Sequence, residues 1–130
     1  MAVSKINRIQ SFQYAFEGIG HTLKTQRNAQ IHVAVAAVIV LFGLYVRLNL
    51  TDWAILTLTM GFVISAEMLN TATEAAMDFA TSDFHPQVKI VKDVAAGAVL
   101  VAAITAVIVG LLILGPPLFQ LLRSFIGGSL

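Results

Sequence analysis

The chain has 130 residues, of which 58% are hydrophobic and only 12% are charged, and its formal net charge is +1. Soluble domains are typically about 45–50% apolar and about 25% charged, so this composition indicates an integral membrane protein with a single small domain. The near-neutral charge gives no reason to expect a nucleic-acid partner, and the absence of cysteine excludes disulfides and thiolate metal sites.

The first predicted element is an amphipathic helix over residues 4–26, with Ser4 as its expected N-cap. Its apolar residues are spaced by three or four positions, which places them on one side of a helix. This apolar stripe consists of Ile6, Ile9, Phe12, Phe16, Ile19 and Leu23. Because the opposite side is polar, we expect the helix to lie on the membrane surface with its apolar side down.

Three later stretches are apolar enough to cross a bilayer, whose core requires about 20 residues of helix. The predicted spans cover residues 28–46, 53–78 and 93–115, with a loop over 79–92 and a tail over 116–130. Gly115-Pro116-Pro117 is expected to end or kink the third helix, because proline lacks the N–H that an α-helix needs. The predicted fold is therefore an all-α membrane protein with one surface helix and three transmembrane helices.

The basic residues near the spans predict the orientation, because cytoplasmic loops carry an excess of lysine and arginine. Only Arg47 and Arg123 fall on the opposite side from the other basic residues, which are Lys5, Arg8, Lys24, Arg27, Lys89 and Lys92. The N-terminus and the 79–92 loop are therefore expected in the cytoplasm, and the C-terminus outside.

The second span changes character in its last part, where Glu67, Asn70, Glu74 and Asp78 follow 14 uncharged residues. At about 100° per residue these four side chains fall within a sector of about 80° on the helix. At 1.5 Å per residue, Glu67 lies about 21 Å and Glu74 about 32 Å from the start of the span at Trp53. Glu67 is therefore expected near the inner boundary of the bilayer, and Glu74 at the cytoplasmic water interface.

A carboxylate inside a bilayer costs roughly 2.5–3.5 kcal/mol at a helix centre, so Glu67 is expected to have a function that justifies this cost. A proton acceptor is one such role, and hydrogen bonding between helices is the structural alternative. Short connections place antiparallel helices side by side, so Lys92 and Asp93 are expected to face Glu74 and Asp78. Lys92 is then either a salt-bridge or interface residue, or a ligand for a phosphate whose metal ion is held by the acids.

Residues 67–78 carry the motif E-x-x-N-[ST]-A-x-E-x-x-x-D, which together with Lys92-Asp93 resembles the prokaryotic diacylglycerol kinase family. The stretches SFQYAFEGI (11–19) and QRNAQIH (26–32) are similar to its Gram-positive branch, which includes undecaprenol kinases. The resemblance covers nearly the whole chain. It implies a homotrimer in the bacterial inner membrane that uses ATP and Mg²⁺ to phosphorylate a lipid alcohol, either undecaprenol or diacylglycerol.

The resemblance also implies roles for individual residues. Glu67 would be the catalytic base for the lipid hydroxyl, and Glu74 would bind Mg²⁺. Asn70 and Asp78 would support the polar face. The residues expected to contact ATP are Tyr14, Gln26, Glu74, Asp83, His85, Lys92 and Asp93.

Two positions depart from the family pattern. Gln26 stands where the family has a second metal-binding glutamate, and Gln30 stands where arginine is usual. An amide oxygen can coordinate Mg²⁺ but brings no charge, and Mg²⁺ prefers carboxylates. Glu17 lies about 180° around the helix from Gln26, so it is a poor substitute.

Two alternative functions follow from these features. The departure at Gln26 allows a catalytically impaired relative that binds lipid or partners. Intramembrane carboxylates also mark ion pathways, which allows a small proton or cation transport subunit. The first and third spans contain no acid, and this counts against a transport pathway through the full depth of the membrane.

Overall fold

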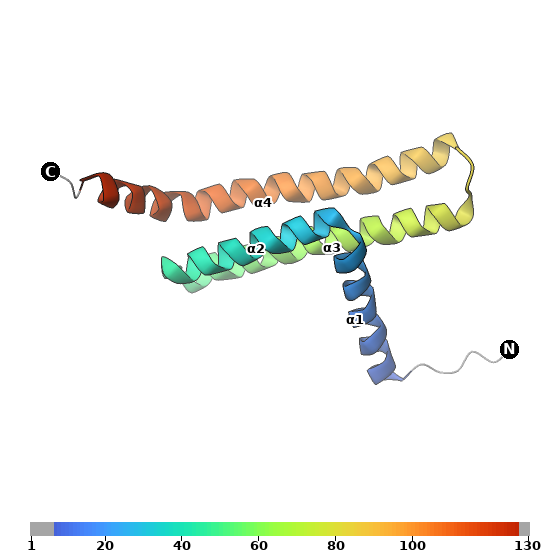
Figure 1. Ribbon diagram of the computed structural model, residues 1–130, viewed down its shortest axis with the longest axis horizontal. Coiled ribbons are helices and arrows are strands. Elements are labelled where there is room, and N and C mark those ends of the chain that lie inside the picture. Colours follow the sequence, from blue (N-terminus) through green and yellow to red (C-terminus); the bar gives the residue numbers. More distant parts are fainter. Residues whose placement is uncertain (1–6, 128–130) are drawn as a thin grey trace.

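The computed structural model describes residues 7–127, and that range forms four helices (Figure 1). They are α1 (Arg8–Thr25), α2 (Arg27–Tyr45), α3 (Leu50–Ala80) and α4 (Pro86–Gly127). Helices α2, α3 and α4 are each long and apolar enough to cross a membrane. The prediction of an all-α chain with an N-terminal helix and three apolar spans is confirmed.

Helix α1 begins at Arg8, and Asn7 caps it within the described residues. The Asn7 side chain accepts a hydrogen bond from the Gln10 N–H, and the Gln10 side chain accepts one from the Asn7 N–H, both at 2.9 Å. This reciprocal arrangement satisfies two backbone donors that a helix start leaves unpaired. The expected N-cap Ser4 lies outside the described residues. The apolar side of α1 is exposed, with Phe12 69% and Phe16 70% accessible.

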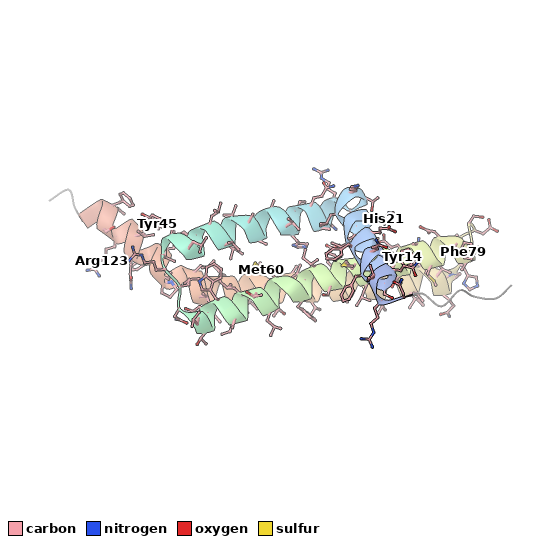
Figure 2. The ribbon with its side chains drawn as sticks, turned by 90° about the horizontal axis from the view of Figure 1, so that it is seen from below. Tyr14, His21, Tyr45, Met60, Phe79 and Arg123 are labelled. Atoms are coloured by element: carbon pink, nitrogen blue, oxygen red, sulfur yellow. The ribbon has the colours of Figure 1, made fainter. Side chains whose placement is uncertain are left out.

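Helix α1 leaves the other helices at a steep angle and projects to the side (Figures 1 and 2). The chain bends at Gln26, whose extended backbone ends α1 and starts α2. Gln30, one turn into α2, donates from its amide Nε2 to the carbonyl oxygen of Leu23 at 3.1 Å. This bond satisfies one of the carbonyl groups left without a partner at the end of α1, so it stabilises the bend.

Helices α3 and α4 run antiparallel and side by side, and α2 packs on α3 (Figures 1 and 2). The core between α3 and α4 consists of Val63, Ala66, Val99 and Ala102, with Ala106 packed against it. Alanine and valine let the two backbones approach closely, which is how helices associate in lipid, where the hydrophobic effect between them is absent. This hairpin fixes the height of α3 relative to α4.

The turn between α2 and α3 brings Gly43 against Trp53. A side chain on Gly43 would meet the Trp53 ring and Leu48, each at 3.0 Å, so glycine permits the close approach of the two helices. Asn49 caps α3 by accepting a hydrogen bond from the Asp52 N–H at 2.9 Å. The turn therefore sets which residues of α2 lie opposite which residues of α3.

The helix bounds differ from the prediction in two places. The connection between the last two helices is confined to residues 81–85 instead of 79–92, because α4 starts at Pro86. Proline fits the first turn of a helix, where its missing N–H has no partner to lose. Of the two outcomes expected at Gly115-Pro116-Pro117, a helix end is wrong, because α4 continues through both prolines to Gly127; a kink there stays a prediction. The mostly apolar residues 118–122 continue the helix beyond the prolines.

Candidate active site

Glu67 is the most deeply buried charged side chain among the described residues, with 2% of its surface exposed. It lies on α3, in the turn that follows the core residues Val63 and Ala66. Its carboxylate oxygen Oε1 is buried and makes no hydrogen bond. His32 of α2 places its ring atom Nε2 3.3 Å from this oxygen, close enough for an ion pair but without hydrogen-bond alignment.

Thr71 lies one turn after Glu67 and is also buried. Its hydroxyl donates to the backbone carbonyl of Glu67 at 2.8 Å, so the hydroxyl is satisfied within the helix. It therefore does not compete for the Glu67 carboxylate.

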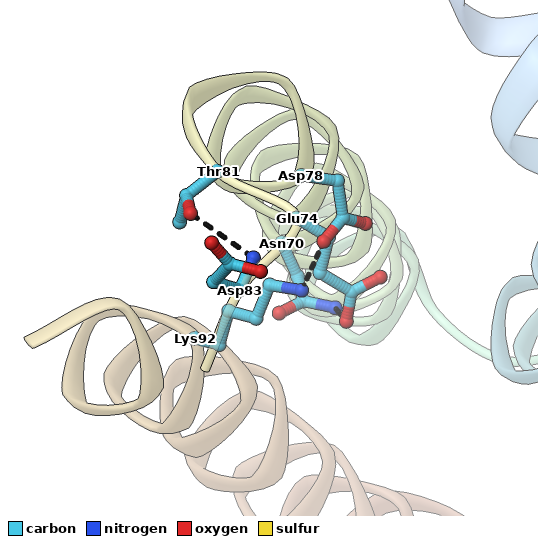
Figure 3. Close-up of polar contacts among 6 residues, drawn as sticks. All are labelled: Asn70, Glu74, Asp78, Thr81, Asp83 and Lys92. Carbon is cyan, nitrogen blue, oxygen red and sulfur yellow. Dashed lines mark hydrogen bonds and ion pairs between the residues drawn. The ribbon is translucent and has the colours of Figure 1, made fainter. Parts of the chain in front are cut away.

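Asn70 and Glu74 form the middle of the polar face (Figure 3). The Asn70 amide Nδ2 donates to Glu74 Oε1 at 3.0 Å, which holds the glutamate against α3. The amide oxygen of Asn70 is buried and has no hydrogen-bond partner. The amide oxygen of Asn70 and the carboxylate of Glu74 therefore both lie on the side of α3 that faces α4.

Lys92 of α4 forms an ion pair with Asp78 of α3, as Figure 3 shows. The prediction that Lys92 faces the acids of the second span is confirmed. Asp93 instead pairs with Lys89, one turn earlier on its own helix. Glu74, Asp78 and Lys92 therefore lie at the end of α3 that leads into the α3–α4 connection, and Glu67 lies deeper in the bundle.

Asp83 and His85 lie in that connection and are exposed. The Asp83 N–H donates to the Thr81 hydroxyl at 3.1 Å. The His85 ring atom Nδ1 accepts from the Gln87 N–H at 3.2 Å, which caps the start of α4. Both side chains thus border the same end of the α3–α4 hairpin as Lys92.

The two remaining predicted nucleotide contacts lie on or next to α1. Tyr14 is exposed on α1, and half-buried Gln26 occupies the bend between α1 and α2. The Gln26 side chain makes no capping hydrogen bond to the start of α2. Within residues 7–127, no three histidine or acidic side chains gather closely enough to enclose a metal ion.

The donor set at the polar face still suits magnesium. Mg²⁺ usually binds proteins through one or two carboxylates and completes its shell with water and substrate phosphates. Glu74 supplies an oxygen ligand of this kind on α3, near Asp78 and its ion-pair partner Lys92, a lysine that can approach phosphate. The residues present therefore fit a Mg²⁺–nucleotide complex better than a fully enclosed metal ion.

His32 is the site residue that sequence reasoning missed. It belongs to the stretch QRNAQIH, which pointed to the family without pointing to a role for this residue. The sequence alone carries no clear signal for the pairing: His32 stands 13 residues before the end of α2 at Tyr45, and Glu67 stands 17 residues after the start of α3 at Leu50. Their contact therefore depends on the exact turn between the two helices.

Comparison with known proteins identifies the relatives of this chain. Residues 13–114 match the model of a family described as prokaryotic diacylglycerol kinase. The undecaprenol kinase of Bacillus subtilis is 43% identical over 116 residues, which cover 88% of this chain and 94% of that protein.

Two further relatives carry the name diacylglycerol kinase. The one from Synechocystis is 42% identical over 117 residues, or 89% of this chain and 67% of that protein. The one from Helicobacter pylori is 31% identical over 72 residues, or 55% of this chain and 56% of that protein. With a family match over most of its length and a relative that aligns nearly end to end, this chain belongs to the prokaryotic diacylglycerol kinase family.

Proposed function

We propose that this protein transfers the γ-phosphoryl group of MgATP to the hydroxyl of undecaprenol at the cytoplasmic face of the membrane. Its family makes it a membrane lipid kinase, a phosphotransferase that uses ATP and has an alcohol acceptor. The observation that carries the proposal is the grading of burial along one face of α3. Glu67 is buried, Asn70 and Glu74 are half-buried, and Asp78 is exposed.

This grading suits a reaction between a lipid and a water-soluble nucleotide. Phosphoryl transfer needs positioning and charge stabilisation more than covalent chemistry. Glu67 removes the proton from the lipid hydroxyl as that oxygen attacks the γ-phosphorus and the bond to ADP breaks. Glu74 lies about 10.5 Å farther along the helix axis, at the water interface where the nucleotide binds.

The remaining polar residues position the nucleotide. Lys92 leaves its ion pair with Asp78 and binds the phosphates instead. Asp93 on α4, and Asp83 and His85 in the connection, border the nucleotide. Tyr14 and Gln26 approach it from α1 and the bend. Mg²⁺ held by Glu74, with Gln26 as a neutral second ligand, supplies charge neutralisation on the phosphates when bound.

The choice of undecaprenol rests on likeness to one branch of the family. The relative from Bacillus subtilis is named undecaprenol kinase, and the stretches over residues 11–19 and 26–32 resemble the Gram-positive pattern, apart from Gln26 and Gln30. Diacylglycerol is the competing substrate, because the relative from Synechocystis is about as similar. Family membership favours both over a transport subunit.

We further propose a multi-pass protein of the bacterial inner membrane, with the N-terminus in the cytoplasm and the C-terminus outside. The support is the distribution of basic residues, of which Arg27, Lys89 and Lys92 lie at the polar-face end of the bundle. We also propose a homotrimer, since large apolar side chains are exposed on every described helix and one chain does not enclose its metal ligands. Mass spectrometry of the intact complex released from detergent tests the trimer.

The proposed reaction is tested by phosphate transfer from radiolabelled ATP to undecaprenol and to diacylglycerol in detergent micelles. The protein itself should label undecaprenol faster, and Glu67→Gln should label neither lipid. Glu17→Gln is the matched control, because it removes an exposed acid on α1 outside the polar face, and it should keep the full rate. Faster labelling of diacylglycerol would reverse the order of substrates. Failure of the unmodified protein to label either lipid would indicate an impaired relative.

A further inference from the structure

The burial of Glu67 creates a problem that the proposed reaction leaves unsolved. Each turnover places one proton from the lipid hydroxyl on this carboxylate. Only 3% of the Glu67 side chain is exposed, and Oε1 has no hydrogen-bond partner. A base that keeps its proton cannot accept the next one, so the proton needs a path out of the helix bundle.

His32 lies where such a path would begin. Its Nε2 is 3.3 Å from Glu67 Oε1, and among the described residues no other basic side chain comes within ion-pair distance of Glu67. The His32 side chain is 26% exposed, so it extends from the buried oxygen to the surface of the chain. Imidazole both accepts and donates a proton through its ring nitrogens, which suits it to a relay.

The surroundings of His32 give this path a direction. Toward the middle of the membrane, His32 borders a narrow cavity of about 50 Å³ whose other lining residues are all apolar. They include Val35, Ile39, Met60, Val63 and Ile64. Toward the other end, α2 reaches the bend at Gln26 after about 9 Å, and the polar face of α3 continues through Asn70 and Glu74. The polar face that begins at Glu67 therefore continues toward the proposed cytoplasmic end, away from this apolar cavity.

We infer that His32 is a positioning residue that orients the Glu67 carboxylate and relays its proton to water, an inference that rests on the proposed function. After phosphoryl transfer, protonated Glu67 passes its proton to neutral His32 Nε2, which leaves a carboxylate and an imidazolium. The imidazolium then gives one proton to water or buffer and returns to the neutral form. The missing hydrogen-bond alignment between the two groups is restored by rotation of either side chain.

The test measures kcat and KM of His32→Ala and His32→Gln in the same phosphate-transfer assay. Glutamine keeps a hydrogen-bond donor for Glu67 but cannot relay a proton. Both variants should lose kcat by about 100-fold, the low end for a positioned proton-transfer group, with unchanged KM for ATP and lipid. Added imidazole should restore the rate of His32→Ala in proportion to its concentration and should do nothing for Glu67→Gln. His21→Gln, an exposed histidine on α1, is the control and should keep the full rate.

The results separate this inference from the proposed function. A first outcome is that Glu67→Gln is inactive while either His32 variant stays within threefold of the kcat of the unmodified protein. In that case the relay is refuted, and Glu67 remains the proposed catalytic base. If both His32 variants are slow but imidazole restores nothing, the role of His32 is structural and the inference fails. If Glu67→Gln keeps its rate, the proposed base is wrong, whatever the His32 variants do.

Discussion

The contact between Gly43 and Trp53 allows a stability change to be worked out atom by atom. In Gly43→Ala the new Cβ lies 3.0 Å from Leu48 Cδ1 and from two ring carbons of Trp53. Non-bonded carbon atoms prefer about 3.5–4.0 Å, so the indole ring must move by about 0.5–1 Å. Such overpacking typically costs about 1–3 kcal/mol. Alanine regains about 0.5–1 kcal/mol over glycine within a helix, which leaves a net loss of about 1 kcal/mol.

Gly110→Ala on α4 is the matched control, because a Cβ at that position meets nothing within 4 Å. It should gain stability by about 0.5–1 kcal/mol from the same helical preference. The two variants are compared by unfolding with sodium dodecyl sulfate in mixed micelles, followed by the fluorescence of Trp53, the one tryptophan in the chain. Gly43→Ala should also shift the emission of the folded protein. Equal unfolding midpoints for the two variants, with unchanged Trp53 emission, would refute the packing argument.

Three further predictions concern the nucleotide site. Lys92→Met should raise KM for ATP at least tenfold while changing stability by no more than about 1 kcal/mol, because exposed ion pairs contribute little; steady-state kinetics and thermal unfolding check both. Gln26→Glu should lower the Mg²⁺ concentration that gives half the maximal rate, since a carboxylate binds Mg²⁺ better than an amide; an unchanged Mg²⁺ titration would mean that another ligand serves. Gln30→Ala removes the bond to Leu23 and should speed proteolysis at the bend by severalfold, with Gln13→Ala, which changes an exposed glutamine on α1, as the control.

The number and order of the helices follow from the sequence because composition and periodicity act over many residues at once. An apolar stretch of about 20 residues has few alternatives to a membrane span, and α2, α3 and α4 are each long and apolar enough to cross a membrane. The helix ends depend on single residues and are less certain. Pro116 and Pro117 stop most helices, but the apolar residues after them favour continuation, and nothing local decides between the two.

The polar face of α3 was predictable for a related reason. Positions 67, 70, 74 and 78 follow the helical repeat, so a single helix determines that they share one side. Contacts between helices are a different matter. The ion pair of Lys92 with Asp78 was anticipated because the connection is short, whereas the approach of His32 to Glu67 depends on the exact turn after α2. The role of Gln26 depends on a bend that only the folded chain reveals.

The length of α2 has a consequence for the membranes in which this protein can work. Its 19 residues extend about 28 Å, close to the bilayer core of about 30 Å, whereas α3 and α4 extend about 46 Å and 63 Å. In the proposed orientation, α2 is therefore only just long enough to cross the bilayer core. Helix α1 on the membrane surface fixes the cytoplasmic end of α2. A thicker bilayer must thin around α2 or pull it lengthwise, at a fraction of a kcal/mol per Å. This stretching acts on α2, which holds His32 against Glu67. We therefore expect the acyl-chain length of the surrounding lipid to change the rate of phosphoryl transfer.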